Sequence, residues 1–465
     1  MTALASAIRC GGCGYVADPD DPYPFRCPRT GTDDTDHVLV RVLDPDAVRF
    51  PAASATQDGQ AAPEANPFLR YRALMHSYHV AVARGMPDAS YRQLVAALDA
   101  CVAATDGRGF RATPFARHAN LSAALGFAPD GGVWVKDETG NVAGSHKGRH
   151  LMGVLIHLSV MAAVGLADPG DRPGLAIASC GNAALAAAVV ARAGDWALTV
   201  FVPADADPGI VRRLRDLRAS VVTCPRDPAA PGDPAYHRLR AELARGALPF
   251  TTQGPENGLT IEGGETLGYE LATDLPDGLD HLIVQVGGGA LASSCAQALR
   301  EAAELGALRR LPRIHTVQTS GAHPLERAYE RVRTALPSAP SPDAGLDAGG
   351  LDAITRAVDV AARHRSEYMW PWDTEPKSVA TGILDDETYD WRAVVEHMLI
   401  TGGRPVVVSE SALVEANRLA VARTGIAVDP TGSSGLAGLV DLRHRGEIGD
   451  HDRVAVLFTG IRRVS

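Results

Sequence analysis

The stretch that decides the fold is Lys136-Asp-Glu-Thr-Gly-Asn-Val-Ala-Gly-Ser-His-Lys-Gly-Arg-His150. It follows the apolar run Val133–Val135, which is typical of a buried strand, and leads into a helical pattern that begins near Gly148. Lys147 therefore stands at the start of a helix, beside unpaired backbone N–H groups and the positive end of the helix dipole. This environment disfavours the protonated amine and helps a lysine to act as a nucleophile toward an aldehyde. A single lysine is more often a plain surface residue, so the interpretation depends on the turns found elsewhere in the chain.

A second turn from strand to helix is Ala178-Ser-Cys-Gly-Asn-Ala183. Ser179, Gly181 and Asn182 can offer a hydroxyl, a backbone N–H and an amide N–H to an anion such as a carboxylate. A plain helix N-cap is the alternative interpretation of this turn. Cys180 is expected to be an inert thiol rather than a nucleophile, because no histidine stands near it in the sequence.

Two more turns follow apolar strands. Val286-Gly-Gly-Gly-Ala-Leu291 comes directly after one of them, and its three glycines let the backbone wrap closely around a phosphate. A dinucleotide-binding loop is the alternative, but the spacing does not give Gly-x-Gly-x-x-Gly. Near the C-terminus, the strand predicted over Val454–Phe458 ends on the hydroxyl of Thr459.

The central part of the chain alternates short apolar runs with helical patterns, such as those of Asn182–Ala193 and Ala292–Ala303. This rhythm predicts an α/β fold of parallel sheets that are covered by helices on both faces. A longer helical pattern covers Phe68–Ala104, and the Pro- and Gly-rich segment Thr334–Thr374 is expected to be a surface insertion. The strand candidates are residues 133–135, 174–177, 198–202, 220–222, 282–286, 314–317, 405–408 and 454–458.

The N-terminal segment has the cysteine pattern of a zinc ribbon, in Cys10-Gly-Gly-Cys13 and Cys27-Pro-Arg-Thr30. A complete ribbon has a fourth cysteine near Thr30, which is absent here. A zinc ion held by Cys10, Cys13 and Cys27 would need Asp33, Asp34 or His37 as its fourth ligand. The alternative is a ribbon that keeps its turns without a metal.

Composition excludes several classes of function. The net charge of −10 and the absence of a basic run argue against nucleic-acid binding. No uninterrupted run of about 18 apolar residues indicates a membrane span, and residues 1–10 do not have the pattern of a secretory signal. Seven cysteines in 465 residues do not form a disulfide framework, so a reducing cytoplasm is expected.

Together, these turns resemble the fold type II pyridoxal-phosphate (PLP) enzymes, the tryptophan synthase β-subunit superfamily. The resemblance extends from about Arg111 to Arg462 and keeps the order and spacing of the blocks. The further blocks that carry it are Arg111-Ala-Thr-Pro-Phe115, Asn257-Gly-Leu-Thr-Ile-Glu-Gly-Gly-Glu-Thr266, Lys377-Ser-Val-Ala-Thr-Gly-Ile383 and Val428-Asp-Pro-Thr-Gly-Ser-Ser-Gly-Leu-Ala437.

The resemblance implies a role for each turn. Lys147 holds PLP as a Schiff base and later takes the α-proton of the substrate, and His146 lies near the phosphate. The other residues implied to bind the cofactor are Asn182 at the 3-hydroxyl, Gly287, Gly288, Gly289, Ala290 and Leu291 at the phosphate, and Thr459 at the pyridine nitrogen. The substrate carboxylate is implied to bind at Ser179, Cys180 and Gly181.

We expect two parallel-sheet, three-layer domains of the fold type II PLP enzymes and a small N-terminal ribbon-like segment. Residues 1–44 form the ribbon-like segment and residues 45–67 a linker. Residues 68–150 and 261–465 form the large PLP-binding domain, and residues 151–260 form a smaller mobile domain that shields the site from water. The resemblance also implies a homodimer and a small-molecule amino-acid substrate.

Within the superfamily, the chain is most similar to threonine synthases, through the N-terminal cysteines and Phe68-Leu-Arg-Tyr71. His146 and Gly148 stand where those enzymes usually have Phe and Asp. Glu265 stands where they commonly have a lysine, and an acidic side chain disfavours a phosphorylated substrate.

We therefore expect a threonine synthase-like lyase or replacement enzyme, which removes the α-proton of an amino acid and eliminates a group from Cβ or Cγ. One alternative is a serine/threonine dehydratase-type ammonia-lyase or a β-replacement enzyme of specialised metabolism. The other alternative is a non-catalytic ligand-binding protein on the same fold.

Overall fold

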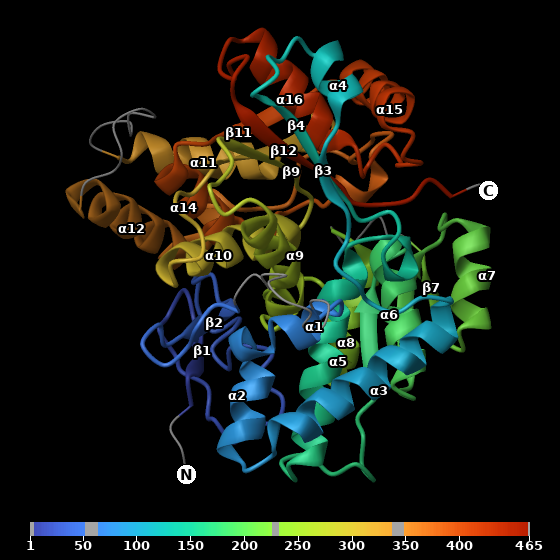
Figure 1. The fold of residues 1–465 in the computed structure, drawn as a ribbon. Coiled ribbons are helices and arrows are strands. Elements are labelled where there is room, and N and C mark those ends of the chain that lie inside the picture. Colours follow the sequence, from blue (N-terminus) through green and yellow to red (C-terminus); the bar gives the residue numbers. More distant parts are fainter. Residues whose placement is uncertain (1–3, 52–63, 226–231, 337–347, 464–465) are drawn as a thin grey trace, which may run out of the picture.

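The computed structural model describes residues 4–51, 64–225, 232–336 and 348–463, and it contains three sheets (Figure 1). The largest sheet has six strands in the order β11-β10-β9-β12-β4-β3, and all of its neighbours are parallel except β3 and β4. Its strands are β3 (Phe115–Arg117), β4 (Gly132–Asp137), β9 (His281–Gln285), β10 (Arg313–Thr319), β11 (Pro405–Val408) and β12 (Arg453–Phe458). The predicted parallel sheet is therefore confirmed, with one short antiparallel strand at its edge.

Helices cover both faces of this sheet because successive side chains of its strands point to opposite faces. Leu282 and Val284 of β9 belong to a core with helices on one face, whereas Ile283 packs against helices on the other. The first face is covered by α9 (Thr260–Asp274), α10 (Ala290–Glu304), α11 (Pro324–Thr334), α12 (Ala348–Arg363) and α14 (Trp391–Thr401). The second is covered by α4 (Ala119–Ala124), α15 (Glu410–Thr424) and α16 (Ser434–His444).

A second, four-stranded parallel sheet has the order β7-β6-β5-β8. Its strands are β5 (Leu175–Ala178), β6 (Leu198–Pro203), β7 (Ser220–Cys224) and β8 (Leu248–Pro249). The helices near it are α5 (Lys147–Ala163), α6 (Asn182–Ala193), α7 (Pro208–Asp216) and α8 (Pro234–Leu243). Leu175 and Ile177 pack on the side of α5 and α6, whereas Ala176 faces the side of α8, so this sheet also lies between two layers of helices.

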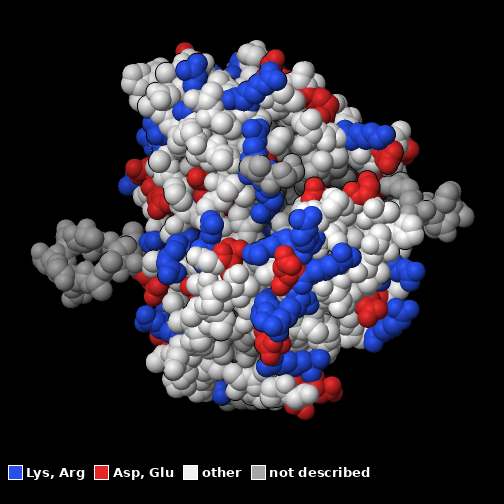
Figure 2. All heavy atoms as spheres, turned by 90° about the vertical axis from the view of Figure 1, so that its right-hand side faces the viewer, with Lys and Arg blue, Asp and Glu red and all other residues white. Residues whose placement is uncertain are grey.

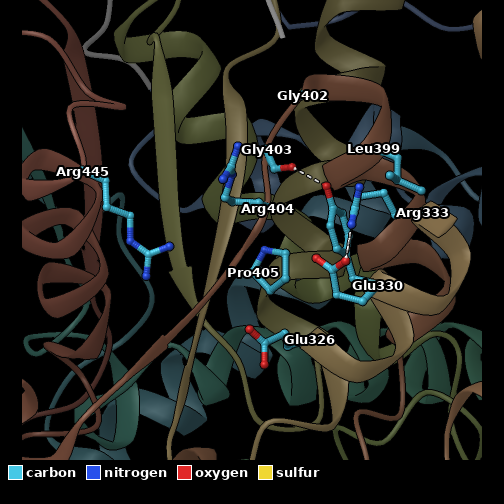
Figure 3. A pocket seen from close by; sticks show the side chains of 10 residues that line it. Glu326, Glu330, Arg333, Leu399, Gly402, Gly403, Arg404, Pro405 and Arg445 are labelled. Atoms are coloured by element: carbon cyan, nitrogen blue, oxygen red, sulfur yellow. Dashed lines mark hydrogen bonds and ion pairs between the residues drawn. The ribbon is translucent and has the colours of Figure 1, made fainter. Parts of the chain in front are cut away.

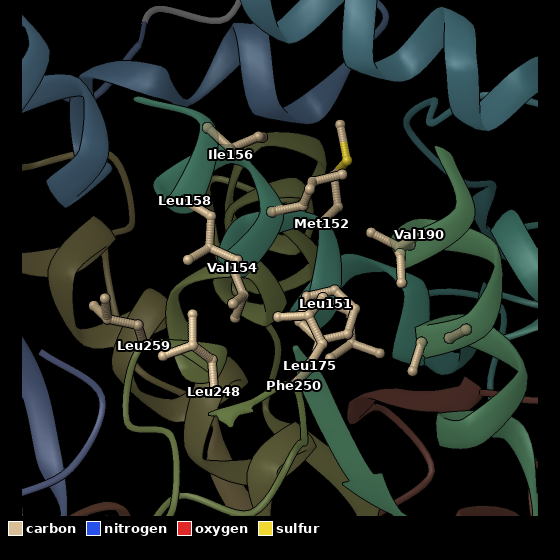
Figure 4. Packing of buried hydrophobic residues seen from close by; sticks show 14 of the residues in the cluster. Leu151, Met152, Val154, Ile156, Leu158, Leu175, Val190, Leu248, Phe250 and Leu259 are labelled. Carbon is tan, nitrogen blue, oxygen red and sulfur yellow. The ribbon is translucent and has the colours of Figure 1, made fainter. Parts of the chain in front are cut away.

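Helix α5 forms the centre of the core beside the small sheet (Figure 4). Its apolar side chains between Leu151 and Leu158 lie among Leu175 of β5, Val190 of α6 and Phe250, which directly follows β8. The helix also approaches α9 very closely, since a Cβ on Gly153 would lie 2.7 Å from Cα of Gly263. This close contact fixes α5, the helix that begins with Lys147, against α9, which covers the large sheet.

The N-terminal segment forms an antiparallel pair of β1 (Ser6–Cys10) and β2 (Leu39–Leu43). The helical pattern predicted over Phe68–Ala104 is broken into α1 (Pro67–Arg70), a short 3-10 turn (Arg72–Leu74), α2 (His76–Ala83) and α3 (Asp88–Asp106). Helices α2 and α3 pack against α5 and α6 and so lie beside the small sheet. Most of the expected linker, residues 52–63, lies outside the described residues.

The expectation of a surface insertion over Thr334–Thr374 is wrong for its second half. Helix α12 packs on α14, and its Ile354, Val358 and Ala361 are fully buried in the core on one face of the large sheet. A short helix, α13 (Arg365–Tyr368), follows it, and residues 337–347 lie outside the described residues. The apolar residues of α12 are spaced at helical intervals and bury one face of the helix. The overall composition of the segment did not indicate this helix.

Two features of the surface bear on the search for a site. On the face shown in Figure 2, Lys and Arg side chains lie interleaved with Asp and Glu side chains. None of the helices in the described part of the chain combines the length and the apolar content that a membrane span needs.

The topology brings three of the four sequence-predicted turns to one edge of the large sheet. Strands β9, β12 and β4 are neighbours and parallel, so their carboxyl ends lie side by side. In open α/β sheets, ligands bind in the crevice outside the carboxyl ends of the strands. Gly287, Thr459 and the loop that leads to Lys147 all follow these three ends.

Candidate active site

A small cavity of about 50 Å³ lies at the carboxyl ends of β9, β12 and β4. It brings together residues that the sequence predicted as parts of a single site, although they come from widely separated parts of the chain. The residues that line it are His146, Lys147, Gln285, Gly287, Gly288, Gly289, Ala290, Leu291, Gly382, Ile383, Asp385, Thr431 and Thr459.

Lys147 is the first residue of α5 and reaches this cavity. Its Nζ donates a hydrogen bond to Oγ1 of Thr252 at 3.3 Å. Burial lowers the pKa of Lys147, while Asp385 and Asp390 act in the opposite direction. The chain has three lysines, and the other two lie elsewhere: Lys136 is buried in an ion pair with Glu270, and the side chain of Lys377 is 80% exposed. Lys147 is therefore the one lysine placed for covalent chemistry.

His146 directly precedes Lys147 and also lines the cavity. Its Nδ1 lies 3.3 Å from the backbone oxygen of Thr459, and its buried Nε2 has no hydrogen-bond partner in the described residues. Burial, and then the charge of Lys147, hold the pKa of His146 well below its ordinary value. A neutral ring with a free nitrogen at this position can hydrogen-bond a ligand in the cavity.

The glycine turn provides backbone donors. Gly289 has a φ of 100°, which favours glycine, and it forms the N-cap of α10 without any capping side chain. The first N–H groups of α10 therefore point out of the helix end toward the cavity that Ala290 and Leu291 line. An uncapped helix N-terminus with an adjoining glycine turn is a binding site for a phosphate.

Thr459 is held by a residue that sequence reasoning missed. Gln285, the last residue of β9, donates from Nε2 to Oγ1 of Thr459 at 2.8 Å and to the backbone oxygens of Gly432 and Leu457. Because the threonine oxygen already accepts this bond, its own proton is available for an acceptor in the cavity. A polar residue at the end of a buried apolar strand was the signal for Gln285.

The turn at the end of β5 approaches from the small sheet. Asn182 begins α6, and its Nδ2 lies close enough to Gly460 that a Cβ there would be 2.8 Å away. Its Oδ1 accepts a hydrogen bond from Nη2 of Arg463 at 3.0 Å, which leaves the amide nitrogen as the free donor. Asn182 therefore lies beside the residue that follows Thr459, but neither Asn182 nor Ser179, Cys180 and Gly181 line the cavity itself.

Two carboxyl groups near Lys147 were not predicted. Burial raises the pKa of Asp385 to about 6 and that of Asp390 to about 8. Asp385 accepts a hydrogen bond from the backbone of Gly288, and a Cβ on Gly287 would lie 2.3 Å from its Oδ2. No local motif marks these residues, because they belong to a segment about a hundred residues beyond the glycine turn, from which Asp385 reaches the cavity.

The structure overturns the interpretation of Glu265 as a residue that acts on the substrate. Glu265 lies in α9 and is buried in an ion pair with Arg41 of β2, together with Glu301 and Tyr269. Its carboxyl is occupied in this network between the N-terminal sheet and α9–α10. Glu265 therefore carries no information about a phosphate on the substrate.

A larger cavity, of about 420 Å³, lies elsewhere (Figure 3). It is an open hollow beside α11, α14 and β11, and it contains three arginines. Each of them is paired with a carboxylate: Arg333 with Glu330, Arg404 with Glu447 and Arg445 with Asp441. These arginines are neutralised, and neither a lysine nor the glycine turn is present, so we do not place the active site there.

A protein-family model described as "Pyridoxal-phosphate dependent enzyme" matches residues 108–460 of this chain. The chain belongs to the pyridoxal-phosphate-dependent enzyme family. The matched range agrees closely with the Arg111–Arg462 range that the sequence motifs predicted, and it confirms PLP as the cofactor.

Two curated relatives and one solved structure illustrate the likeness. The chain is 25% identical over 350 residues to threonine synthase of Methanocaldococcus jannaschii. The aligned region covers 75% of this chain and 74% of that protein. It is 36% identical over 132 residues to L-threonine ammonia-lyase of Geobacter sulfurreducens, 28% of this chain and 30% of that protein. The fold is that of maize serine racemase, with a TM-score of 0.56 over 80% of this chain and 93% of that one, at 18% identity.

The donor set around the cavity fits PLP. The glycine turn and the start of α10 suit its phosphate, the Thr459 hydroxyl suits the pyridine nitrogen, and Lys147 suits the aldehyde. Gly382, Ile383 and Asp385 line the same cavity, so the carboxyl of Asp385, which accepts from the backbone N–H of Gly288, lies beside the groups that suit the phosphate.

Asp385→Asn is expected to strengthen PLP binding about 3- to 10-fold at pH 8, because it removes a negative charge beside the phosphate site. Burial raises the pKa of Asp385 to about 6, so its carboxyl is ionised at pH 8 and largely neutral at pH 5. The advantage of the variant should therefore disappear at pH 5. Fluorescence titrations with PLP at both pH values measure this ratio, with Asp352→Asn, on the exposed face of α12, as the control. An equal ratio at both pH values would contradict the electrostatic explanation.

Proposed function

We propose that this chain is a PLP-dependent lyase that removes the α-proton of an amino acid and eliminates a substituent from its side chain. The observation that carries the proposal is the position of Lys147: it is the one lysine of three in a cavity that the glycine turn and Thr459 also line. Family membership and this position together leave no support for the non-catalytic alternative.

Each residue of the site has a separate role in this proposal. Bound PLP supplies an electron sink for the electrons left on the substrate Cα. Lys147, whose pKa burial lowers, takes the α-proton as the general base. Gly287–Leu291 and His146 hold the phosphate, and Thr459, oriented by Gln285, donates to the ring nitrogen. Asn182 donates to the 3-hydroxyl from α6.

The turn of Ser179, Cys180 and Gly181 is proposed to bind the substrate carboxylate. It stands at the carboxyl end of β5 and at the start of α6, where no side chain caps the helix. The free N–H groups of such a helix end favour an anion. Because this turn belongs to the small sheet, a shift of residues 151–260 toward the large sheet would bring the substrate to Lys147 and exclude water.

The charge around the site favours a substrate without a phosphate. Burial raises the pKa of Asp390 to about 8 and keeps its carboxyl largely neutral at pH 7, but Asp385, with a pKa of about 6, is ionised beside Lys147. Asp205, Asp233 and Asp385 also act on Cys180. Like charges across a binding site cost affinity. An ammonia-lyase that converts L-threonine or L-serine to a 2-keto acid and ammonia is therefore the first candidate.

A threonine synthase-like reaction on O-phosphohomoserine is the second candidate. The similarity to the threonine synthase of Methanocaldococcus jannaschii favours it, because that similarity extends over 75% of this chain, far more than the similarity to the ammonia-lyase.

One set of assays separates these candidates. The PLP-loaded protein is mixed with L-threonine, L-serine and O-phosphohomoserine, and its visible absorption, 2-keto acid, ammonia and inorganic phosphate are followed. We expect keto acid and ammonia from L-threonine or L-serine and no phosphate release. Phosphate and threonine from O-phosphohomoserine would establish the second candidate instead. Absorption that changes with none of the three compounds would exclude both candidate reactions. A protein that binds no PLP would overturn the proposal.

A homodimer and a cytoplasmic location complete the proposal. The first is implied by the family resemblance. The second is supported by the seven cysteines, all of which are free thiols in the structure.

A further inference from the structure

Four side chains of the N-terminal segment meet at one point, and none of them lines the PLP cavity. Cys10, Cys13, Cys27 and His37 each direct one ligand atom to it, and these atoms lie within 4.8 Å of one another. Cys10, Cys27 and His37 are buried, and Cys13 is half-buried. Sulfur and imidazole ligands in the ratio of three to one form a common structural zinc site.

The distances match the edges of a tetrahedron around zinc. Zinc–sulfur bonds of about 2.3 Å and a zinc–nitrogen bond of about 2.0 Å imply edges of about 3.8 Å between sulfurs and about 3.6 Å from sulfur to nitrogen. The Sγ atoms of Cys13 and Cys27 are 3.7 Å apart, and Sγ of Cys10 lies 3.6 Å from Nδ1 of His37. These two pairs form opposite edges of one tetrahedron.

A carboxylate fixes the orientation of the histidine. Nε2 of His37 lies 3.0 Å from Oδ1 of Asp33, so Nδ1 is the nitrogen that faces the sulfurs. Histidines that bind a metal commonly donate their other ring N–H to a carboxylate in this manner. Of the three residues that the sequence left open, His37 is therefore the ligand, and Asp33 positions it.

The backbone around the cysteines is shaped for such a site. A Cβ on Gly12 would lie 2.1 Å from the backbone oxygen of Asp36, so only glycine fits between the first two cysteines and the turn of His37. Gly14 has a φ of 72° and donates its N–H to the oxygen of Cys10, which closes the first turn. The N–H of Thr30 bonds to the oxygen of Cys27 and closes the second. Thr30 occupies the place of the missing cysteine, and its buried Oγ1 has no hydrogen-bond partner in the described residues.

The segment that this cluster closes also contacts the PLP-binding body at several points. The backbone oxygen of Phe25 accepts from the N–H of Gly258, and the oxygen of Pro22 lies 3.0 Å from Nε2 of His157 in α5. On the other side, the N–H of Asp36 bonds to the oxygen of Ala362 at the end of α12. Gly258 lies only a few residues beyond Thr252, which contacts Lys147.

We propose that Cys10, Cys13, Cys27 and His37 bind one structural Zn²⁺, oriented by Asp33, and that this ion fixes the N-terminal segment against α5 and the loop before α9. With four protein ligands the coordination is closed, so the ion holds structure and does not take part in the reaction.

Metal analysis of the full-length protein tests this proposal. After incubation with Zn²⁺ and dialysis, we expect one zinc ion per chain in the wild type and in Cys101→Ser, whose cysteine lies exposed on α3. Cys27→Ser is expected to reduce the zinc content at least 10-fold, and His37→Cys to retain it as a four-cysteine site. Asp33→Asn is expected to weaken zinc binding about 10- to 100-fold. Co²⁺ in place of zinc should give the ligand-field absorption of a tetrahedral site with three sulfurs.

Several results would overturn the proposal, and none depends on PLP or on activity. Wild-type protein that takes up no zinc is one, and a zinc content unaffected by Cys27→Ser is another. A disulfide between Cys13 and Cys27, found by mass spectrometry of the alkylated protein, would replace the metal site by a redox pair. If Cys27→Ser fails to fold, the wild-type zinc content and the Co²⁺ spectrum still decide the matter.

Discussion

Lys147→Ala abolishes the covalent attachment of PLP and lowers the rate of elimination at least about 10³-fold, because it removes both the amine that holds the cofactor and the base that takes the α-proton. The attachment is measured by reducing the PLP-loaded protein with borohydride and locating the modified lysine by peptide mass spectrometry. The chain is well suited to this experiment, since it contains three lysines. We expect the modification on Lys147 alone.

Two controls separate chemistry from folding. Lys377→Ala removes an exposed lysine that is paired only with Glu375, so both attachment and rate should remain at the wild-type level. Lys147→Arg keeps a cation in the cavity without an amine that can react, and it should be as inactive as the alanine variant. PLP found on Lys377, or a Lys147→Ala variant that keeps its activity, would show that the site has been misplaced.

The parallel strands were predictable because burial on both faces produces a continuous apolar run. All eight strand candidates are strands in the structure. The missed ones are β1 and β2, the five-residue pair of the ribbon-like segment, and two very short strands: β8 has two residues, and β3 is an antiparallel strand of three. Such very short strands bury too little apolar surface to give a pattern, so only their neighbours in the sheet define them.

The family, and the meeting of several of these turns at one cavity, were predictable because several turns at fixed spacing are more specific than any one of them. What the sequence could not indicate is how these turns are supported. Gln285 reaches Thr459 across two neighbouring strands, and Asp385 reaches Gly288 from a distant segment. Both contacts depend on the order of the strands, which no local pattern specifies.

Glu265 illustrates the opposite error. Its place where threonine synthases commonly have a lysine suggested an effect on a phosphorylated substrate, but the structure buries its carboxyl against Arg41 from the N-terminal sheet. A charge that the sequence places in a motif can serve an ion pair with a residue more than two hundred positions away. The pairing partner, and therefore the role, comes from the tertiary structure alone.

Arg149→Met is expected to cause the largest loss of stability of any single change considered. Arg149 lies two residues after Lys147 on α5 and is fully buried. Its Nε donates to Glu138 at 2.9 Å and its Nη1 to Glu270 at 2.7 Å. Lys136 pairs with the other oxygen of Glu270, so the cluster holds two cations and two carboxylates. It connects β4, α5 and α9 directly beneath the helix start that presents Lys147.

Removal of the arginine leaves one buried negative charge without a partner, which costs about 3–5 kcal/mol. A loss of this size lowers the melting temperature by roughly 10 °C in a domain of about 150–250 residues. Arg309→Met is the control, because the ion pair between Arg309 and Asp277 is exposed and contributes at most about 1 kcal/mol. The double variant Arg149→Met/Glu138→Gln restores neutrality and should recover most of the loss. A double variant that melts as low as the single one would attribute the loss to packing instead.

The pH dependence gives an independent test of the same cluster. Burial alone would raise the pKa of Glu138, but Arg149 lowers it to about 2, and the pKa of Glu270 is lowered for the same reason. Both carboxyls therefore stabilise the wild type above their unfolded pKa of about 4.3, and this contribution is lost only as the pH falls toward 2. Without Arg149, burial prevails and raises these pKa values, so lowering the pH from 8 to 5 neutralises the unpaired charge in the variant. The difference in melting temperature between wild type and Arg149→Met should therefore shrink from pH 8 to pH 5. A constant difference would mean that the guanidinium acts by filling space rather than by its charge.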